Sequence, residues 1–537
     1  LYLFSQPLFN LFISSLFAFF GQQPITNTVQ EAMGWSYEHA WQSFNYGLLL
    51  FAGGMLVILS KNLRDEHPHH IFALVWSLVM LVSTWQHIRY EYYLAINIAL
   101  LSGICVSFVI DLVWRVHIRT VAGSVPAGQG SQDRVKGDAP KKKTTKSSKK
   151  RGDQLHNSGY LPLALAVLVV GLAILFVYTS ASLSYTSVSG LGAQMNPDWK
   201  ESLEWLGNNT PETGVDYLTI YDPKTFRYPN QSYGVMSWWD YGHMITYIAK
   251  RIPNANPFQQ GVSGPDGSAS YFIATSEDTA NRILDNDGTR YVMTDIPMDD
   301  LITGKFHAMA TWHNSSAGLS PFIKSFYIQG SDNASQFEYA WFIDQNYFLT
   351  MVSRLHTFDG SMTNATQAYF IMYADPTVTG TPLPVVTGGG LLNATDAVLR
   401  ADKYAAVAPA GYHAGLYSKS IVQPADTVPA LRHYRLIHES PTNAFSPGTI
   451  DVKYVKVFEY VRGAHISGSG IISIPLVTDT GRHFTYRQES SNGEFIVPYS
   501  TTGSSYGVKA EGLYRIEGTG QTFDVPEAAV MEGTAVS

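Results

Sequence analysis

The two parts of this chain differ in one respect that restricts its fold. Only the first third contains apolar runs that approach the length of a membrane span, at residues 1–20, 44–59, 70–84, 94–114 and 161–180. A helix needs about 20 mostly apolar residues to cross the hydrocarbon layer, or somewhat fewer when its ends are amphipathic. The two shorter runs, 44–59 and 70–84, also fit buried helices of a soluble core. Because five runs lie so close together, we predict a transmembrane domain of about five spans at residues 1–183.

A basic segment before the last apolar run indicates the orientation. Residues 115–153 contain eleven Lys and Arg residues against three Asp. Positive residues beside spans remain in the cytoplasm, so we expect residues 115–158 to form a flexible cytoplasmic linker. A nucleic-acid-binding tail is the alternative, but the flanking spans and the net charge of −7 argue for no nucleic-acid partner. We therefore expect a multi-pass protein of the cell membrane whose residues after 180 are extracytoplasmic.

The rest of the chain has the composition of an extracytoplasmic region. Residues 184–537 carry 22 Lys and Arg against 34 Asp and Glu, and the whole chain has one Cys, which excludes a disulfide framework. Helical and strand patterns alternate at first, and from Val452 onward alternating apolar runs dominate. We predict a mixed α/β domain at residues 184–445 and a β-sandwich-like module at 446–537. Six Asn-x-Ser/Thr tripeptides begin at Asn208, Asn230, Asn314, Asn333, Asn364 and Asn393.

The motif SWWDYG at residues 237–242 is the most specific local signal. Trp238 and Trp239 provide two indole N–H donors beside the carboxylate acceptor of Asp240. Together they suit a small hydroxyl group, such as that of Ser or Thr. The alternative is that the indoles are core aromatics and Asp240 caps a helix.

Two further motifs lie in the loops that the alternation of spans places outside. TVQE at residues 28–31 offers the Glu31 carboxylate, which suits an amide or a divalent cation, although a helix-start glutamate is the simpler interpretation. QHIRYEYY at residues 86–93 offers Arg89 among tyrosines. The planar guanidinium suits a lipid phosphate, whereas anchoring at the headgroup level is the alternative.

Three weaker patterns complete the set. Asp295 and Met298 precede Lys305 and Met309, which are one helical turn apart and form either a wall beside the hydroxyl site or part of the core. The His-rich residues 67–70 are interpreted as a surface loop and not as a metal site. The glycines at 388–390 lack a following Lys-Ser/Thr and are interpreted as a turn.

In combination these motifs resemble one family, the catalytic subunit of oligosaccharyltransferase in its archaeal single-subunit (AglB-type) form. The resemblance depends on WWDYG at 238–242, on TVQE at 28–31, on Q-x-x-R at 86–89 and on the split Asp/Met/Lys/Met pattern at 295–309. It covers nearly the whole chain. One departure is the stretch 299–301, which looks like a small insertion and puts the register of the 295–309 pattern in doubt.

The resemblance implies a role for each matching residue. Trp238, Trp239 and Asp240 would hold the +2 Ser/Thr hydroxyl of an Asn-x-Ser/Thr acceptor. The same pocket would be lined by Asp295, Met298, Lys305 and Met309. Glu31 would bind the acceptor amide and a metal, Mn²⁺ or Mg²⁺, and Arg89 would contact the phosphate of the lipid donor. The resemblance implies that the remaining metal ligands lie upstream of Leu1, because the family's first membrane helices and their metal-binding aspartates are not in this sequence.

The function expected from this resemblance is transfer of a glycan from a dolichol-type lipid (pyro)phosphate to the Asn amide of a sequon. The partners implied are a lipid-linked oligosaccharide, acceptor polypeptides and the membrane, and the protein would work as a single subunit. Two alternatives stay open. One is a membrane-anchored, non-catalytic surface or carbohydrate-binding protein, and the other is a glycosyltransferase that uses a polyprenyl-phosphate sugar on other acceptors.

Overall fold

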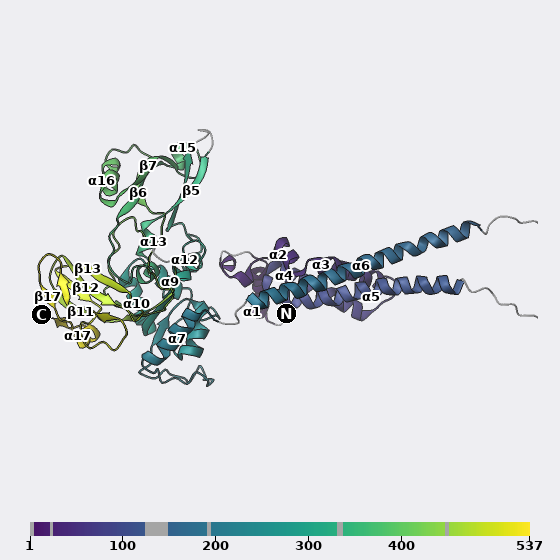
Figure 1. Ribbon diagram of the computed structural model, residues 1–537, viewed down its shortest axis with the longest axis horizontal. Helices are drawn as coiled ribbons and strands as arrows, with labels where there is room; N and C mark the ends of the chain where they lie inside the picture. Colours follow the sequence, from purple (N-terminus) through teal and green to yellow (C-terminus); the bar gives the residue numbers. More distant parts are fainter. Residues whose placement is uncertain are drawn as a thin grey trace, which may run out of the picture. The chain divides into compact units, whose positions relative to one another are not determined.

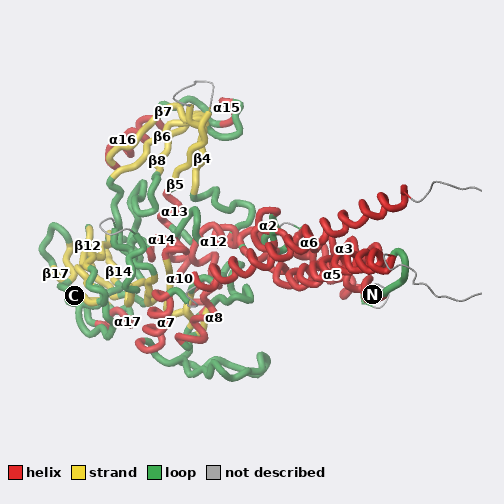
Figure 2. The backbone as a smooth tube through the Cα atoms, turned by 45° about the vertical axis from the view of Figure 1, so that its right-hand side comes forward, coloured by secondary structure: helices red, strands yellow, loops and turns green. Residues whose placement is uncertain are grey.

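The computed structural model describes residues 5–21, 25–123, 149–190, 195–329, 337–445 and 450–536. The chain divides into two compact units, residues 1–194 and 195–537. The first unit is helical, and the second combines helices with four β-sheets (Figures 1 and 2). The predicted fold class, a helical membrane part followed by α/β and β-rich parts, is therefore confirmed. Residues 115–123 and 149–158 of the predicted flexible linker are helical, which differs from the prediction, and residues 124–148 lie outside the described residues.

Each of the five apolar runs of the first unit forms helix. The helices are α1 (Gln6–Phe20), α2 (Tyr37–Phe44), α3 (Tyr46–Asn62), α4 (Pro68–Gln86), α5 (Glu91–Gly123) and α6 (Lys149–Gly190), with one-turn 3₁₀ segments at η1 (Thr26–Thr28), η2 (Gln30–Ala32) and η3 (Ile88–Tyr90). In the described residues, α4, α5 and α6 are long and apolar enough to span a membrane. Helices α2 and α3 are long and apolar enough to span a membrane only if the bent pair is counted as one span. Helix α1 has 15 residues, fewer than the roughly 20 that a perpendicular span needs.

Small side chains and one turn residue determine how these helices pack. A Cβ atom at Gly54 of α3 would lie 2.1 Å from the carbonyl oxygen of Leu101, so glycine allows α3 and α5 to approach closely. Asn45 separates α2 from α3 with φ at +32°, and the two helices differ in direction by 92°. The Asn45 side chain accepts the backbone N–H of Tyr46 and the hydroxyl of Thr179 from α6. These contacts hold the bend against α6.

The His-rich residues differ from the prediction. His69 and His70 belong to the first turn of α4, and Pro68 occupies the first helical position, where its missing N–H is not needed. The interpretation of residues 67–70 as a loop is therefore wrong beyond His67. The described residues contain no group of three His, Cys, Asp or Glu side chains placed to hold a metal ion.

The second unit is built around a central mixed sheet of order β2-β1-β3-β10-β9. Its strands are β2 (Ile252–Pro253), β1 (Gly234–Met236), β3 (Thr289–Asp295), β10 (Val455–Tyr460) and β9 (Tyr434–Glu439). Strands β2, β1 and β3 are parallel, and β10 pairs antiparallel with both β3 and β9. Around them lie α7 (Pro197–Asn209), η4 (Trp239–Tyr241), α8 (Gly242–Met244), the π-helical turn η5 (Ile245–Ala249), α9 (Ser268–Ile273), α10 (Glu277–Asp287), α11 (Ile296–Asp299), α12 (Phe306–His313), α13 (Gln345–Leu349) and α14 (Met351–His356).

A second five-stranded sheet is inserted between α12 and β9. Its order is β5-β4-β7-β6-β8, with β5 (Phe337–Ile343), β4 (Ile323–Gln329), β7 (Val385–Asn393), β6 (Gln367–Ala374) and β8 (Tyr412–Tyr417). Helix α16 (Ala394–Ala405) packs on this sheet, and α15 (Pro376–Thr379) follows β6 (Figure 1). The glycines 388–390 lie inside β7 and pair with β6, so the predicted turn is wrong. At Gly389 φ is +138° and a Cβ would lie 2.1 Å from the carbonyl oxygen of Phe370, which only glycine tolerates.

The C-terminal region is rich in strands. One sheet has the order β14-β11-β18, and another has the order β13-β12-β16-β17 with β15 paired to β12. The strands are β11 (Ala464–Ser467), β12 (Ile471–Val477), β13 (His483–Glu489), β14 (Glu494–Val497), β15 (Lys509–Ala510), β16 (Tyr514–Ile516), β17 (Thr522–Phe523) and β18 (Ala535–Val536), with α17 (Glu527–Glu532) before the last. Their apolar side chains join the same core as the central sheet.

Candidate functional site

The WWDYG segment begins directly after β1, where the chain leaves the central sheet. Trp238 is 1% exposed and belongs to the core, while Trp239 and Asp240 are half-buried in the short helix η4. The Asp240 side chain makes no capping bond there. The alternative interpretation of this motif therefore fits Trp238 as a core aromatic, but Asp240 is not a helix cap.

Asp240 forms an ion pair with Lys305, the residue that precedes α12. The Lys305 ammonium also lies 4.0 Å from the centre of the Tyr241 ring, which gives a cation–π contact. The Asp240 and Lys305 side chains are 33% and 27% exposed, so both charges reach the surface. The site thus offers a carboxylate acceptor and an ammonium donor side by side, as recognition of a hydroxyl requires.

The indole of Trp239 adds an unused donor. Its Nε1 atom is buried and has no hydrogen-bond partner in the part of the chain that the structure describes. A buried N–H without a partner costs about 1–3 kcal/mol. Such a donor next to the Asp240–Lys305 pair is a reason to expect an oxygen acceptor from a ligand.

Asp295 supports this arrangement from below. It is fully buried, accepts the backbone N–H of Met298 at the start of α11, and accepts the indole N–H of Trp199 at 2.8 Å. The Tyr241 hydroxyl donates to the same carboxylate. Burial raises the pKa of Asp295, and these hydrogen bonds oppose the rise. Asp295 therefore positions Tyr241 beneath Lys305.

The two methionines of the predicted pocket wall are also buried. Met298 and Met309 are both 0% exposed and belong to the core around the central sheet. Met298 lies in α11 and Met309 in α12, and neither methionine reaches the surface. Their role in a pocket remains a prediction.

The apparent insertion at residues 299–301 is a compact turn. The Asp300 side chain accepts the backbone N–H groups of Ile302 and Thr303, and the Lys305 N–H returns to the Pro297 carbonyl. A Cβ at Gly304 would lie 2.2 Å from that carbonyl oxygen, so only glycine permits this return. The turn brings Lys305 back toward α11, which is how the split pattern keeps its four residues close.

Two aromatic residues of this site were missed by sequence reasoning. Tyr241 belongs to the WWDYG motif, and its position there was the available signal. Trp199, from α7, stacks on Tyr241 with ring centres 3.8 Å apart. Nothing in the sequence around Trp199 links it to Asp295, the residue 96 positions away to which its indole N–H donates.

The first unit brings together Glu31 and Arg89. Arg89 Nη2 lies 3.2 Å from Glu31 Oε2, and the side chains are 53% and 71% exposed. They line a hollow of about 580 Å³ with Gln30, Ile88, Tyr90, Tyr92 and Tyr93. An ion pair this exposed contributes little to stability, about 0–1 kcal/mol, so structural need does not explain it.

Backbone contacts hold the two loops of this hollow together. The Ile88 N–H donates to the Met33 carbonyl at 2.9 Å, and the Trp35 N–H donates to the Trp85 carbonyl. The His87 ring bonds to the carbonyls of Ala32 and Phe19. Glu31 and Arg89 are therefore placed by a fixed framework. They belong to the first unit, whereas Asp240 and Lys305 belong to the second, so the structure assembles each pair separately.

Glu31 is the one acidic group in this hollow among its described lining residues. Its Oε2 atom faces Arg89, and its Oε1 atom makes no hydrogen bond to the described residues. A carboxylate oxygen of this kind can serve as one ligand of a hard divalent cation. The described residues supply no further ligands that would complete such a site.

The fold is similar to that of archaeal oligosaccharyltransferases. It superimposes on AglB from Archaeoglobus fulgidus in complex with an inhibitory peptide and a dolichol-phosphate, with a TM-score of 0.65 and 22% identity, covering 100% of this chain and 62% of that one. Two other structures of an oligosaccharyltransferase from that organism are similar. One is tethered to an acceptor peptide containing the NVT sequon (TM-score 0.63, 22% identity, 99% and 63% covered), and one is a complex with Zn and sulfate (0.60, 22%, 93% and 60%).

The sequence comparisons agree with this similarity and confirm the predicted resemblance to the AglB type. Residues 196–299 match the AglB core domain, and residues 463–536 match the archaeal glycosylation protein B long peripheral domain. The chain is 28% identical to the dolichyl-monophosphooligosaccharide–protein glycotransferase AglB of Haloferax volcanii and 28% identical to dolichyl-phosphooligosaccharide–protein glycotransferase 3 of A. fulgidus. These alignments cover 86% and 88% of the chain but 47% and 54% of the relatives. The chain thus spans about half the length of these relatives.

Proposed function

We propose that this chain is part of an oligosaccharyltransferase that transfers a glycan from a dolichol-type lipid (pyro)phosphate to the Asn side-chain amide of Asn-x-Ser/Thr sequons. The observation that carries the proposal is the Asp240–Lys305 pair beside the unpartnered Trp239 N–H. Trp239 and Asp240 lie in the segment that matches the AglB core domain, and Lys305 directly precedes α12. The acceptor-peptide complex known for a similar structure supports the same assignment.

The acceptor site recognises a hydroxyl because it offers both a hydrogen-bond acceptor and a donor. Asp240 accepts a hydrogen bond from the hydroxyl, and Lys305 or Trp239 donates one to the hydroxyl oxygen. An acceptor with Val or Ala at +2 leaves these groups unpaired, which rejects it more strongly than loss of an apolar contact does. Trp238, Asp295, Met298 and Met309 form the buried support of this site.

The donor and amide side of the reaction is assigned to the first unit. An amide nitrogen is a poor nucleophile because its lone pair is delocalised into the carbonyl. Glu31 accepts a hydrogen bond from the acceptor amide and would supply one ligand to Mn²⁺ or Mg²⁺. When bound, such a cation would supply electrostatic stabilisation to the departing phosphate. Arg89 donates to the same phosphate, and its planar fork matches two phosphate oxygens.

The same proposal includes the setting of the enzyme. The helices of the first unit cross the membrane several times, with the basic segment 115–158 in the cytoplasm and the second unit outside. Residues 184–445 and 446–537 act as the catalytic and β-rich domains, and the enzyme works as a single subunit.

The test is a transfer assay with the chain expressed together with the upstream membrane helices that the resemblance predicts. A lipid-linked oligosaccharide and fluorescent peptides with Asn-x-Thr, Asn-x-Val and Asn-x-Ala are the substrates. We expect transfer to the Thr peptide alone, abolished by EDTA and restored by Mn²⁺ or Mg²⁺. Wild-type rates from Asp240→Ala or Glu31→Ala, or equal use of the Ala peptide, contradict the proposal.

A further inference from the structure

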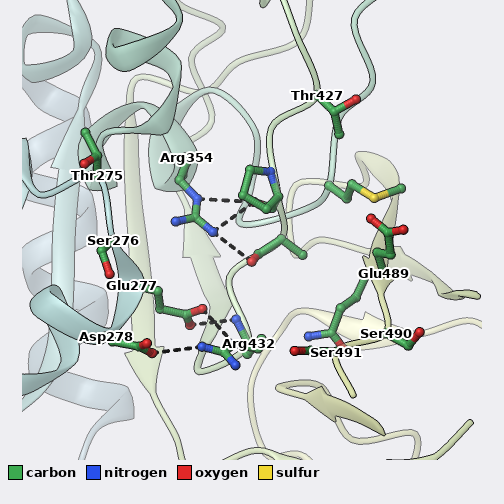
Figure 3. A pocket seen from close by; sticks show the side chains of 14 residues that line it. Thr275, Ser276, Glu277, Asp278, Arg354, Thr427, Arg432, Glu489, Ser490 and Ser491 are labelled. Atoms are coloured by element: carbon green, nitrogen blue, oxygen red, sulfur yellow. Dashed lines mark hydrogen bonds and ion pairs between the residues drawn. The ribbon is translucent and has the colours of Figure 1, made fainter. Parts of the chain in front are cut away.

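A polar hollow of about 730 Å³ lies in the second unit, apart from the residues assigned above (Figure 3). Apart from Met362, its walls come from four separate segments. They are the start of α10 at residues 275–278, Arg354 of α14, the segment 427–432 and the end of β13 with the residues after it, 488–491. Met362 is the one large apolar side chain among the described residues that line it, and no aromatic side chain does.

The walls are fixed before any ligand arrives. Arg354 is 3% exposed and donates to the carbonyls of Pro429 and Ala430. Glu277 accepts the backbone N–H groups of Arg432 and His433 at 2.7 and 3.0 Å, and it also accepts the Arg432 guanidinium. Two buried side chains thus tie one loop to two helices (Figure 3). Preorganisation of this kind reduces the entropy cost of binding.

Several polar groups of the hollow have no partner. Gln488 is 3% exposed, its amide donates to Ile496, and its Oε1 atom is buried without a hydrogen bond within the described chain. Arg354 Nη1 makes no hydrogen bond or ion pair within the described ranges. The exposed Ser276 precedes α10 without making a side-chain cap, so its hydroxyl is available. Buried polar groups are normally satisfied, so the buried Gln488 Oε1 indicates a polar ligand, and Arg354 Nη1 and Ser276 are further donors of the lining.

The charges decide between kinds of ligand. Arg432 is matched by Glu277 and Asp278, while Glu489 lies on the side of the hollow away from Arg354 (Figure 3). The lining has three carboxylates and two guanidiniums, a balance that disfavours phosphate or sulfate. Glu277 and Asp278 are already engaged, so the site offers a metal ion too few ligands.

We propose that this hollow binds an uncharged saccharide. A sugar hydroxyl donates and accepts at once, so neighbouring hydroxyls satisfy the acceptors Gln488 Oε1 and Glu489 together with the donors Arg354 Nη1 and Ser276. The absence of aromatic or extended apolar lining among the described residues disfavours a lipid chain or a base. The saccharide binds here independently of the transfer reaction proposed above.

Saturation-transfer NMR on the full chain in a sugar-free detergent tests the proposal. The probes are the methyl glycosides of glucose, galactose, mannose and N-acetylglucosamine at millimolar concentration, with triglycine and inorganic phosphate as competing classes. We expect signal from at least one glycoside. Glu489→Gln should weaken its binding about tenfold, because hydrogen bonds to a charged acceptor are worth more than neutral ones, and Ser276→Ala should also weaken it.

Glu338→Gln is the matched control, since Glu338 is an exposed glutamate of β5 in another sheet. It should leave binding unchanged, as should Asp240→Asn, which separates this site from the transfer site. Melting temperatures confirm that each variant folds. The proposal fails if no glycoside gives a signal, if triglycine or phosphate binds in its place, or if folded Glu489→Gln and Ser276→Ala bind like the wild type.

Discussion

Lys305 lies over the ring of Tyr241 while its ammonium pairs with Asp240, the residue just before that tyrosine. The tyrosine is held in turn by Asp295, through its hydroxyl, and by Trp199, through stacking. The position of the ammonium is therefore set by a chain of contacts that reaches from the surface to a fully buried carboxylate.

The first prediction concerns this ammonium. Lys305→Met keeps the stem but removes the donor, so use of Asn-x-Thr peptides should fall about ten- to hundredfold in kcat/KM. Tyr241→Phe should have a smaller effect, because it keeps the ring under Lys305 and removes only the bond to Asp295. Peptide titrations in the transfer assay measure both. The exposed Lys403→Met on α16 is the control, and unchanged peptide use by Lys305→Met contradicts the assignment.

The second prediction concerns Arg89. Arg89→Gln should lower kcat by about a hundredfold, because it removes a charged donor from the developing phosphate charge. Arg89→Lys should restore part of the rate, since lysine keeps the charge but loses the two-pronged geometry. Rates at saturating acceptor peptide and varied lipid donor distinguish donor effects from acceptor effects. Arg400→Gln, an exposed change on α16, should have none, and a full rate from Arg89→Gln refutes the donor role.

Sequence reasoning located the elements of both sites but not their connections. The apolar runs predicted α1, α3, α4, α5 and α6 because burial in lipid leaves a long, continuous signal. Helix α2 was missed because all but its last residue lie outside these runs. WWDYG, Glu31 and Arg89 were found because each lies in a short local motif. Trp199 was not found, and the resemblance put Lys305 and Asp240 in one pocket without predicting their ion pair. Both features depend on tertiary packing between distant segments. The three glycines of β7 were wrongly predicted to form a turn, because glycine occurs in turns more often than in strand interiors.

The third prediction follows from Asp299, which is buried next to Met298 and accepts the hydroxyls of Tyr347 and Thr357. Burial raises the pKa of Asp299 to about 7 from an ordinary 3.8. The unfolded chain therefore releases this proton at lower pH than the folded chain does. Stability that Asp299 contributes is fully present below about pH 4 and is lost as the pH rises toward 7.

Asp299→Asn should flatten this dependence, because the amide stays neutral at every pH and keeps an acceptor for one of the hydroxyls. Melting temperatures of the wild type and the variant between pH 4 and 8 provide the measurement, and the wild type should fall relative to the variant as pH rises. The buried Asp359 is a control whose pKa shifts in the opposite direction. Burial opposes ionisation of Asp359, but Lys456 and Arg482 lower its pKa overall. A parallel pH profile for wild type and Asp299→Asn rules out the assignment.

The last prediction concerns Arg435 of β9, which joins the central sheet to the C-terminal region. Its guanidinium lies 2.6 Å from Glu459 of β10 and 2.6 Å from Glu527 of α17, and Glu459 is fully buried. Arg435→Met should lower the free energy of unfolding by about 1.5–3 kcal/mol, because it removes charged hydrogen bonds from a buried carboxylate that keeps Arg290 as its second partner. Arg487→Met removes an exposed pair with Glu517 and should cost less than about 1 kcal/mol. Equal losses in denaturant titrations of the two variants would show that burial of Glu459 does not control the stability of this junction.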